Sequence, residues 1–150
     1  MNIATMLRYV DLKKGDYWDH RYYIMHDFKL FADKYNVGLC AIMTEHDIEA
    51  ICDQCSGLIV PGSATNIDPR YYGRAPLDEV EPVDEYALDA KIIKHFVDHN
   101  KPIFGICGGH QELNIYFGGT IKKVDDPISQ KTFPTILVQN PLDNIPHSFR

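Results

Sequence analysis

Apolar residues are grouped along the chain in two alternating ways, as short continuous runs and as helically spaced stripes. The short runs predict strands over residues 3–10, 37–43, 57–62 and 102–106. The stripes between them predict helices over residues 16–35, 46–52, 82–100 and 108–117. Strands that alternate with helices form parallel sheets with helices on both faces. We therefore expect an α/β fold of the flavodoxin-like type, with a doubly wound, mostly parallel sheet.

Two of the predicted helices have marked starts and apolar faces. Asp16 is expected to cap the first helix, and Pro82 to open the third. The buried face of the first helix is predicted to consist of Ile24, Phe28, Phe31 and Tyr35. The stripe of the third is predicted to consist of Val83, Tyr86, Ala87, Ala90, Ile93 and Val97. We interpret the face of the first helix as core packing rather than as a functional surface.

The composition is that of one globular domain covering residues 1–150. No apolar run approaches the roughly 20 residues that span a bilayer. Residues 1–10 lack the basic and apolar pattern of a secretion signal, so we expect a cytoplasmic location. The formal net charge of -6, without a block rich in Lys and Arg, argues against nucleic acid or an anionic membrane as a partner.

The cysteines are expected to be free thiols, at Cys40, Cys52, Cys55 and Cys107. Cys52 and Cys55 form a C-x-x-C pair, which could indicate a redox or metal site. A redox site of this type opens a helix after a strand, and a structural zinc site needs a second pair of ligands. Neither context is visible in the sequence, so we interpret the pair as chance spacing and predict no metal and no cofactor. Solvated helix faces are expected for His20, His26, His46, His95 and His99.

The sequence "GICGG", residues 105–109, follows an apolar strand and precedes a helical pattern. Small residues on both sides of a nucleophile allow the sharp turn that lifts its side chain above a sheet. The helix that follows directs its N–H groups and positive dipole end toward the thiol. We predict that Cys107 is a nucleophile and that the Gly108 N–H is an oxyanion donor. The alternative is a packed cysteine between glycines that end a strand.

A second loop, "VPGSATNIDPRYYGR", also follows an apolar strand. The carboxyl ends of parallel strands meet at one edge of a sheet, so this loop and Cys107 should lie near each other. Its Pro-Gly-Ser start makes Gly62 and Ser63 the candidates for the other oxyanion donor. The alternative is an ordinary surface connection, although loops of this length in compact domains are usually functional or disordered.

The two motifs together resemble one known family. "PIFGICGGHQELNIYFGGTI" is similar to the nucleophile region of class I glutamine amidotransferases, with the pattern G-x-C-x-G-x-Q. "VPGSATNIDPRYYG" resembles more narrowly the gamma-glutamyl-gamma-aminobutyrate hydrolase branch, and the likeness covers residues 1 to 125. The resemblance implies hydrolysis of a small gamma-glutamyl amide through a Cys107 thioester. It also implies that Gln111 lies near the bound glutamyl group and that no cofactor is needed.

One part of the family pattern is missing from this sequence. The family activates its cysteine with a His-x-Glu pair well downstream of the nucleophile helix, and no such pair lies within residues 118–150. His110 fills a variable motif position on the nucleophile's own helix, and His147 lies near the terminus, so neither is expected to be the base. We therefore expect residues 1–150 to be about the first two thirds of the family domain. A partner chain or a second copy would then cover the incomplete sheet.

Three functions remain open from the sequence. The first is a free-standing gamma-glutamyl hydrolase, which the P-x-x-Y-G pattern favours. The second is a glutaminase subunit that delivers ammonia to a synthase. The third is a binding or assembly protein that keeps the cysteine turn without catalysis.

Overall fold

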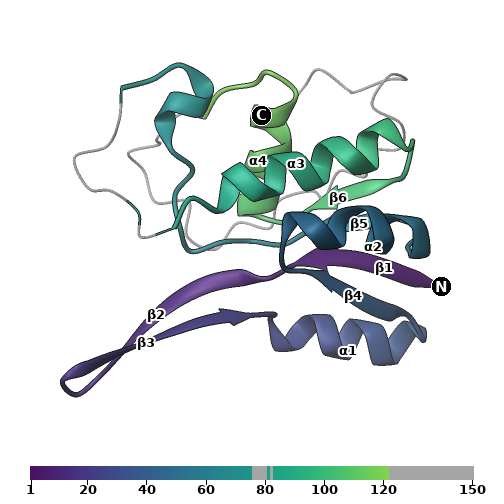
Figure 1. Cartoon of the computed structure of the whole chain (residues 1–150), viewed down its shortest axis with the longest axis horizontal. Coiled ribbons are helices and arrows are strands. Elements are labelled where there is room, and N and C mark those ends of the chain that lie inside the picture. Colours follow the sequence, from purple (N-terminus) through teal and green to yellow (C-terminus); the bar gives the residue numbers. More distant parts are fainter. Residues whose placement is uncertain (76–80, 82, 122–150) are drawn as a thin grey trace, which may run out of the picture.

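The computed structural model describes residues 1–75, 81 and 83–121 (Figure 1). At its centre is a parallel sheet with the strand order β4-β1-β5-β6. These strands are β1 (Asn2–Met6), β4 (Gly38–Ile42), β5 (Leu58–Val60) and β6 (Ile103–Gly105). The chain passes from β1 to one neighbour, β4, and then crosses back to add β5 and β6 on the other side. The predicted doubly wound parallel sheet is confirmed.

The segment between β1 and β4 differs from the prediction. Its first part is an antiparallel hairpin of β2 (Arg8–Lys14) and β3 (Tyr17–Tyr23), and helix is confined to α1 (His26–Tyr35). The helix predicted over residues 16–35 is therefore wrong in its first half. The strand predicted over residues 3–10 is divided between β1 and β2.

The hairpin has a local cause. Gly15, at φ 60°, takes the left-handed conformation that suits the two-residue turn between β2 and β3. Asp16 lies in this turn and is not a helix cap. Four of the seven residues of β3 are Tyr or Trp, which favour strands.

α1 packs through a narrower face than predicted. Phe28 is buried and Phe31 is half-buried, but Ile24 is 38% exposed and Tyr35 is 58% exposed. Ile24 precedes the first helical residue, so it is not on the helix face at all. The helix ends as expected at Asn36, which is left-handed with φ 52°.

The remaining helices follow their predicted positions more closely. They are α2 (Ile48–Gln54), which follows the short 3₁₀ turn η1 (Glu45–Asp47), α3 (Glu85–Asp98) and α4 (Gly108–Tyr116). The stripe predicted for α3 is only partly right, because Ala87 is exposed. The buried residues of α3 are Tyr86, Asp89, Ile92, Ile93 and Phe96. Pro82 lies outside the described residues.

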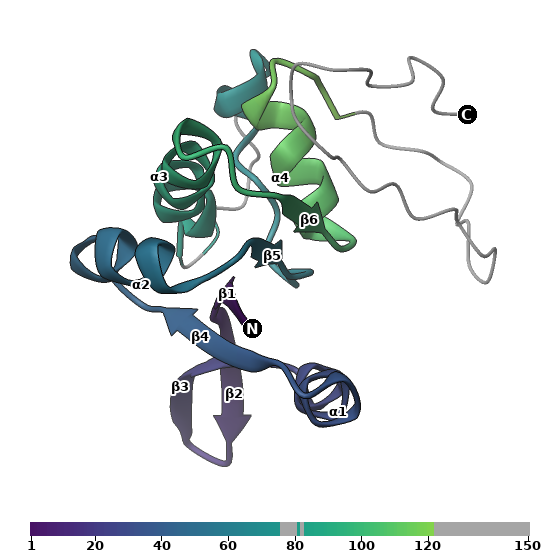
Figure 2. The same ribbon diagram turned by 90° about the vertical axis from the view of Figure 1, so that its right-hand side faces the viewer.

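Helices lie on both faces of the sheet, as predicted. α2, α3 and α4 pack on one face, and α1 lies on the other (Figure 2). The main core lies under the three helices and includes Met6, Ile42, Val60, Phe96 and Leu113. The face on the α1 side carries an open groove of about 310 Å³, lined by Ile3, Phe31, Ile59 and Phe104 among others.

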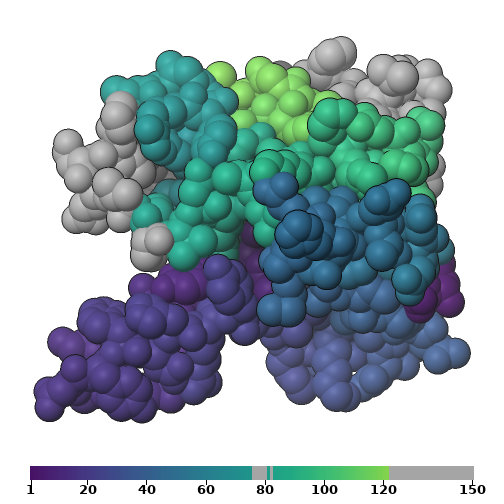
Figure 3. Space-filling view, in the orientation of Figure 1, coloured from purple at the N-terminus to yellow at the C-terminus, as the bar shows by residue number. Residues whose placement is uncertain are grey.

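The hairpin projects from one corner of the molecule (Figure 3). Its large exposed side chains are Leu12, Tyr17, Trp18 and Tyr22. Among the residues that the structure describes, no helix has the length and apolar character needed to cross a membrane.

Candidate active site

Cys107 lies at the sharp turn that joins β6 to α4, and its side chain is exposed. Its backbone, with φ 51° and ψ -113°, is in a region that residues with a side chain rarely occupy. Strain of this kind is typical of a nucleophile held at a strand-to-helix turn. The glycines make the turn possible. A Cβ on Gly105 would lie 2.7 Å from the Gly109 carbonyl oxygen, and a Cβ on Gly109 would lie 2.1 Å from the Val60 carbonyl oxygen.

The Pro-Gly-Ser loop meets this turn. A Cβ on Gly62 would lie 3.3 Å from the Cys107 Cβ and 3.9 Å from its Sγ, so the loop backbone passes directly beside the thiol. A Cβ on Gly108 would lie 2.9 Å from the Ser63 nitrogen. The two predicted sources of oxyanion donors therefore adjoin the same cysteine. The structure brings Gly62, Ser63, Cys107 and Gly108 together, and their chemical roles stay predictions.

The fifth predicted site residue, Gln111, is exposed on the first turn of α4, and its N–H donates to the Cys107 carbonyl oxygen at 3.3 Å. His110 is its neighbour on the same turn and is also exposed, with its N–H 3.0 Å from the same oxygen. His147 lies outside the described residues. The helix therefore places Gln111 at the same end of the sheet as the thiol.

The rest of the loop is tied to the start of α3. A 3₁₀ turn, η2 (Pro69–Tyr72), is capped by Asp68 and ends at Gly73, which is left-handed with φ 73°. The Tyr71 hydroxyl donates to Asp84 Oδ2 at 2.6 Å, and this hydrogen bond raises the pKa of Tyr71 to about 12. Asp84 is also the N-cap of α3, so the Pro-Arg-Tyr-Tyr-Gly segment is fixed to the helix.

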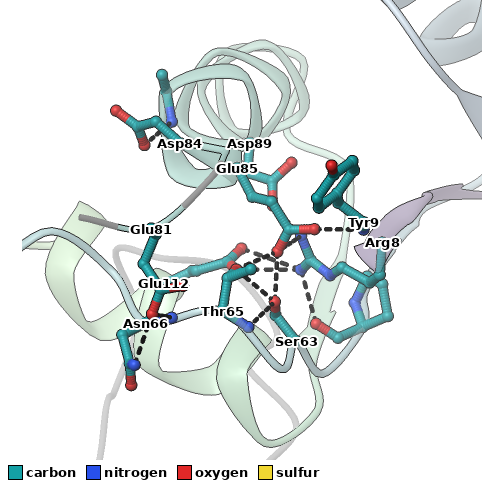
Figure 4. A network of polar contacts seen from close by, with 12 residues as sticks. Arg8, Tyr9, Ser63, Thr65, Asn66, Glu81, Asp84, Glu85, Asp89 and Glu112 are labelled. Carbon is teal, nitrogen blue, oxygen red and sulfur yellow. Dashed lines mark hydrogen bonds and ion pairs between the residues drawn. The ribbon is translucent and has the colours of Figure 1, made fainter. Parts of the chain in front are cut away.

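Glu85 holds the start of the loop after β5, at Ser63 and Thr65, in place (Figure 4). Its Oε2 accepts hydrogen bonds from the Ser63 hydroxyl and, at 2.7 Å, from the Thr65 hydroxyl. Its Oε1 accepts the N–H of Tyr9 at 2.6 Å. The Ser63 side chain is therefore engaged with α3, and the group of Ser63 that lies next to Gly108 is its backbone nitrogen.

Beneath the loop lies a buried cluster around Arg8, which is 1% exposed (Figure 4). Its guanidinium donates to Asp89 of α3, to Glu112 of α4 at 3.1 Å, and to the Pro61 carbonyl oxygen at 2.7 Å. The Pro61 carbonyl belongs to the peptide group that continues into Gly62. One cation therefore joins the loop after β5 to α3 and to α4.

The cluster has more buried carboxyl groups than cations. Burial raises the pKa of Asp89, and burial together with the Asp89 charge raises the pKa of Glu112 to about 9. The two carboxyl groups are hydrogen-bonded to each other. At neutral pH the buried pair therefore retains a proton, and the pKa of about 9 assigns it to Glu112.

Sequence reasoning missed Arg8, Glu85, Asp89 and Glu112. A signal existed for Asp89, because it falls three residues after Tyr86 and four before Ile93 on the buried stripe of α3. Arg8 had no comparable signal, because it is buried only through partners that lie 53 to 104 residues away.

With this geometry in hand, comparison with known proteins decides the family. Residues 9–137 match the model of the family described as Peptidase C26. The chain belongs to the peptidase C26 family. This class I glutamine amidotransferase-like family comprises amidohydrolases and glutaminases that use a cysteine nucleophile.

The individual relatives of this chain differ in the function that their names give. A glutamine-hydrolyzing GMP synthase subunit of Thermoplasma acidophilum is 29% identical over 133 residues, covering 88% of this chain and 55% of that protein. Gamma-glutamyl-gamma-aminobutyrate hydrolase PuuD of Escherichia coli strain K12 is 30% identical over 76 residues, covering 51% of this chain and 30% of that protein. A glutamine amidotransferase-like protein of Lactococcus lactis subsp. cremoris is 42% identical over 67 residues, covering 42% of this chain and 35% of that protein. The chain spans about half the length, or less, of these relatives.

Proposed function

We propose that this chain carries the nucleophile and the oxyanion donors for hydrolysis of a small gamma-glutamyl amide, of the type cleaved by gamma-glutamyl-gamma-aminobutyrate hydrolase. The observation that supports this most is the approach of the Gly62-Ser63 backbone to the Cys107 thiol and to Gly108. A donor on each side of the attacking sulfur is the arrangement that stabilises a tetrahedral oxyanion. The Pro-Arg-Tyr-Tyr-Gly segment, fixed to α3, supports the small-amide branch.

In the proposed reaction, the Cys107 thiolate attacks the side-chain carbonyl carbon of the gamma-glutamyl group. The oxyanion accepts hydrogen bonds from the N–H groups of Gly108 and of Ser63 or Gly62. The carbon–nitrogen bond then breaks, and the amine leaves with a proton. Water attacks the resulting thioester, which releases glutamate and restores the thiol. Gln111 would contact the glutamyl group from the first turn of α4.

The proposal needs a general base for both steps. The one His-x-Glu after Cys107, His110-Gln111-Glu112, lies on the first turns of α4 itself, and its Glu112 is buried against Arg8. The base would therefore come from another residue or another chain. Formation of the thioester can be separated from turnover. A gamma-glutamyl compound with an electrophilic carbon in place of the amide should label Cys107 in this chain even where turnover is slow.

The experiment is to follow labelling by mass spectrometry, together with amine release from gamma-glutamyl-gamma-aminobutyrate and ammonia release from glutamine. We expect saturable labelling of Cys107, protected by glutamate and lost in Cys107→Ser. Labelling no faster than that of a simple thiol would contradict the proposed function and favour a non-catalytic binding role.

A glutaminase subunit is the second candidate. The match to the GMP synthase subunit covers 88% of this chain, against 51% for the hydrolase. A glutaminase of this kind would hydrolyse glutamine faster in the presence of a synthase and would hydrolyse gamma-glutamyl-gamma-aminobutyrate poorly. The ratio of these two activities therefore separates the candidates.

A further inference from the structure

Three side chains that bind metals well meet at the edge of the sheet opposite Cys107. They are Cys52 near the end of α2, His95 in the last turn of α3, and His99 at the C-cap of α3. One ligand atom from each, the Cys52 sulfur and a ring nitrogen from each histidine, lies within 4.8 Å of the others. α2 and α3 lie side by side on the same face of the sheet (Figure 2). Both helices end before the next strand begins, whereas Cys107 follows the end of a strand.

The spacing of these residues is that of a known class of metal site. His95 and His99 are four residues apart, so their rings lie on one face of the helix, with centroids 4.3 Å apart. Zinc sites commonly combine such a His-x₃-His pair with cysteine from another element. The His95 and His99 pair thus supplies the further ligands that the sequence around Cys52 lacked. The other cysteine of that sequence, Cys55, is hydrogen-bonded to Cys40 instead.

The histidines are already arranged for ligation. His99 Nδ1 lies 2.7 Å from the His95 carbonyl oxygen, and because a carbonyl only accepts, Nδ1 must carry the proton. Such a bond leaves the lone pair on Nε2 and fixes the ring, as outer hydrogen bonds do for metal ligands. His95 Nε2 is buried and has no hydrogen-bond partner among the residues that the structure describes. A buried polar atom without a partner is costly, and a metal ion would satisfy it.

We propose that Cys52, His95 and His99 bind a zinc ion that joins α2 to α3, with water as the fourth ligand. Thiolate and imidazole ligands suit Zn²⁺ and disfavour Mg²⁺ and Ca²⁺. Ligand atoms around tetrahedral zinc lie roughly 3.3–3.8 Å apart. Side-chain rotations that move these ligand atoms by about 1 Å would therefore complete the site. Binding releases the Cys52 proton, so the sulfur joins the metal as a thiolate. The Lys101 ammonium donates to the carbonyl oxygens of Cys52 and Cys55. Its positive charge is therefore close to the negative charge of this thiolate.

The site would act on stability rather than on catalysis. It joins two helices that otherwise meet through side-chain packing, and the proposed catalytic groups are at the other end of the strands. A ligand that binds only the folded state raises the unfolding temperature with its concentration. The proposal can therefore be tested without any measurement of activity.

The test uses the full 150-residue chain without a purification tag and with Cys107→Ser, which removes the exposed thiol. Zn²⁺ is titrated by calorimetry, and Co²⁺ binding is followed by absorption. We expect one ion per chain, a thiolate-to-cobalt charge-transfer band, the visible bands of tetrahedral cobalt and a rise in unfolding temperature. Zinc that binds with no charge-transfer band for cobalt would overturn the assignment of Cys52, and no binding would overturn the site.

The matched variants are His99→Gln and His46→Gln, which both replace exposed histidines. His99→Gln should weaken zinc binding by at least about tenfold and abolish the rise in unfolding temperature. His46→Gln, on η1 and outside the cluster, should leave both unchanged. Equal affinity in the two variants would overturn the proposal, and far-ultraviolet circular dichroism checks that each variant is folded.

Discussion

The protonated state of Glu112 leads to a prediction about how stability depends on pH. In the folded chain, the pKa of Glu112 is raised from 4.5 to about 9, first by burial and then by the Asp89 charge. Between these values the folded state holds a proton that the unfolded state has released. Stability from this group is therefore fully present below about pH 4.5 and is lost as the pH rises toward about 9.

The perturbation is Glu112→Gln, which imitates the protonated side chain. Its amide can donate to Asp89 and accept from Arg8, as protonated Glu112 does. At about pH 6 we expect the variant to lie within about 1 kcal/mol of wild type. A full proton difference changes the free energy of unfolding by about 1.4 kcal/mol per pH unit. Wild type should therefore lose up to about 3 kcal/mol relative to the variant between about pH 6 and about pH 8.

The assay is urea unfolding of both chains across this pH range, with the difference in unfolding free energy taken at each pH. The difference removes the contribution of other titrating groups. Glu49→Gln, which changes an exposed residue of α2, is the matched control and should run parallel to wild type. Curves for Glu112→Gln that also run parallel would refute the reasoning, because Glu112 would then be ionised throughout and simply paired with Arg8.

Three further predictions concern the same structure. Gly109→Ala should lower the free energy of unfolding by at least about 3 kcal/mol or prevent folding, because its Cβ would lie 2.1 Å from a backbone oxygen. The control, Gly118→Ala, has open space around it at φ 85° and should lower the free energy of unfolding by only about 1–2 kcal/mol in the same urea assay. Arg8→Met should lower the free energy of unfolding by about 3–5 kcal/mol at neutral pH, because it leaves buried carboxyl groups without their cation. The loss should be smaller in acid, where the carboxyl groups are protonated, and urea unfolding at two pH values would show or exclude this trend. We also propose that the groove on the α1 face is covered by a second copy of the chain or by a partner. If a second copy covers it, light scattering during size-exclusion chromatography should give a mass above the 17.2 kDa of one chain. A monodisperse monomer would contradict self-association.

The features that the sequence predicted correctly depend on local patterns. β4, β5 and β6 are short apolar runs, and each is bounded by Gly or Pro. The turn at Cys107 was predictable because an apolar strand, a turn of small residues and a helical pattern follow one another within one short segment. These arrangements depend on neighbours in the chain, which a single sequence displays.

The hairpin shows how one local pattern can hide another. The helical spacing of Phe28 and Phe31 is real and lies within α1, but it does not extend backward across Gly15 and Asp16. A Gly-Asp pair between residues of strand-forming type is itself a hairpin signal. The aromatic residues of β3 favour the same interpretation. The turn chemistry therefore outweighs the helical spacing in this segment.

The charged cluster shows what a single sequence does not display. Arg8, Asp89 and Glu112 are of residue types that are usually exposed, and each is buried only because partners from distant elements surround it. Charges are buried when they are paired, and the pairing here is a property of the assembled fold. His95 is a milder case, because it is predicted to be solvated on its helix, whereas in the fold it is half-buried and its Nε2 is enclosed.

This cluster also links the chemistry to the core. Pro61, which precedes the proposed oxyanion donors, is hydrogen-bonded to a cation that is itself held by α3 and by the nucleophile helix. A change that opens the cluster would therefore shift the loop relative to Cys107 as well as reduce stability. Because one cation faces several carboxyl groups, the arrangement depends on a retained proton. The proton retained on Glu112 therefore supports the position of the loop as well as the stability of the core.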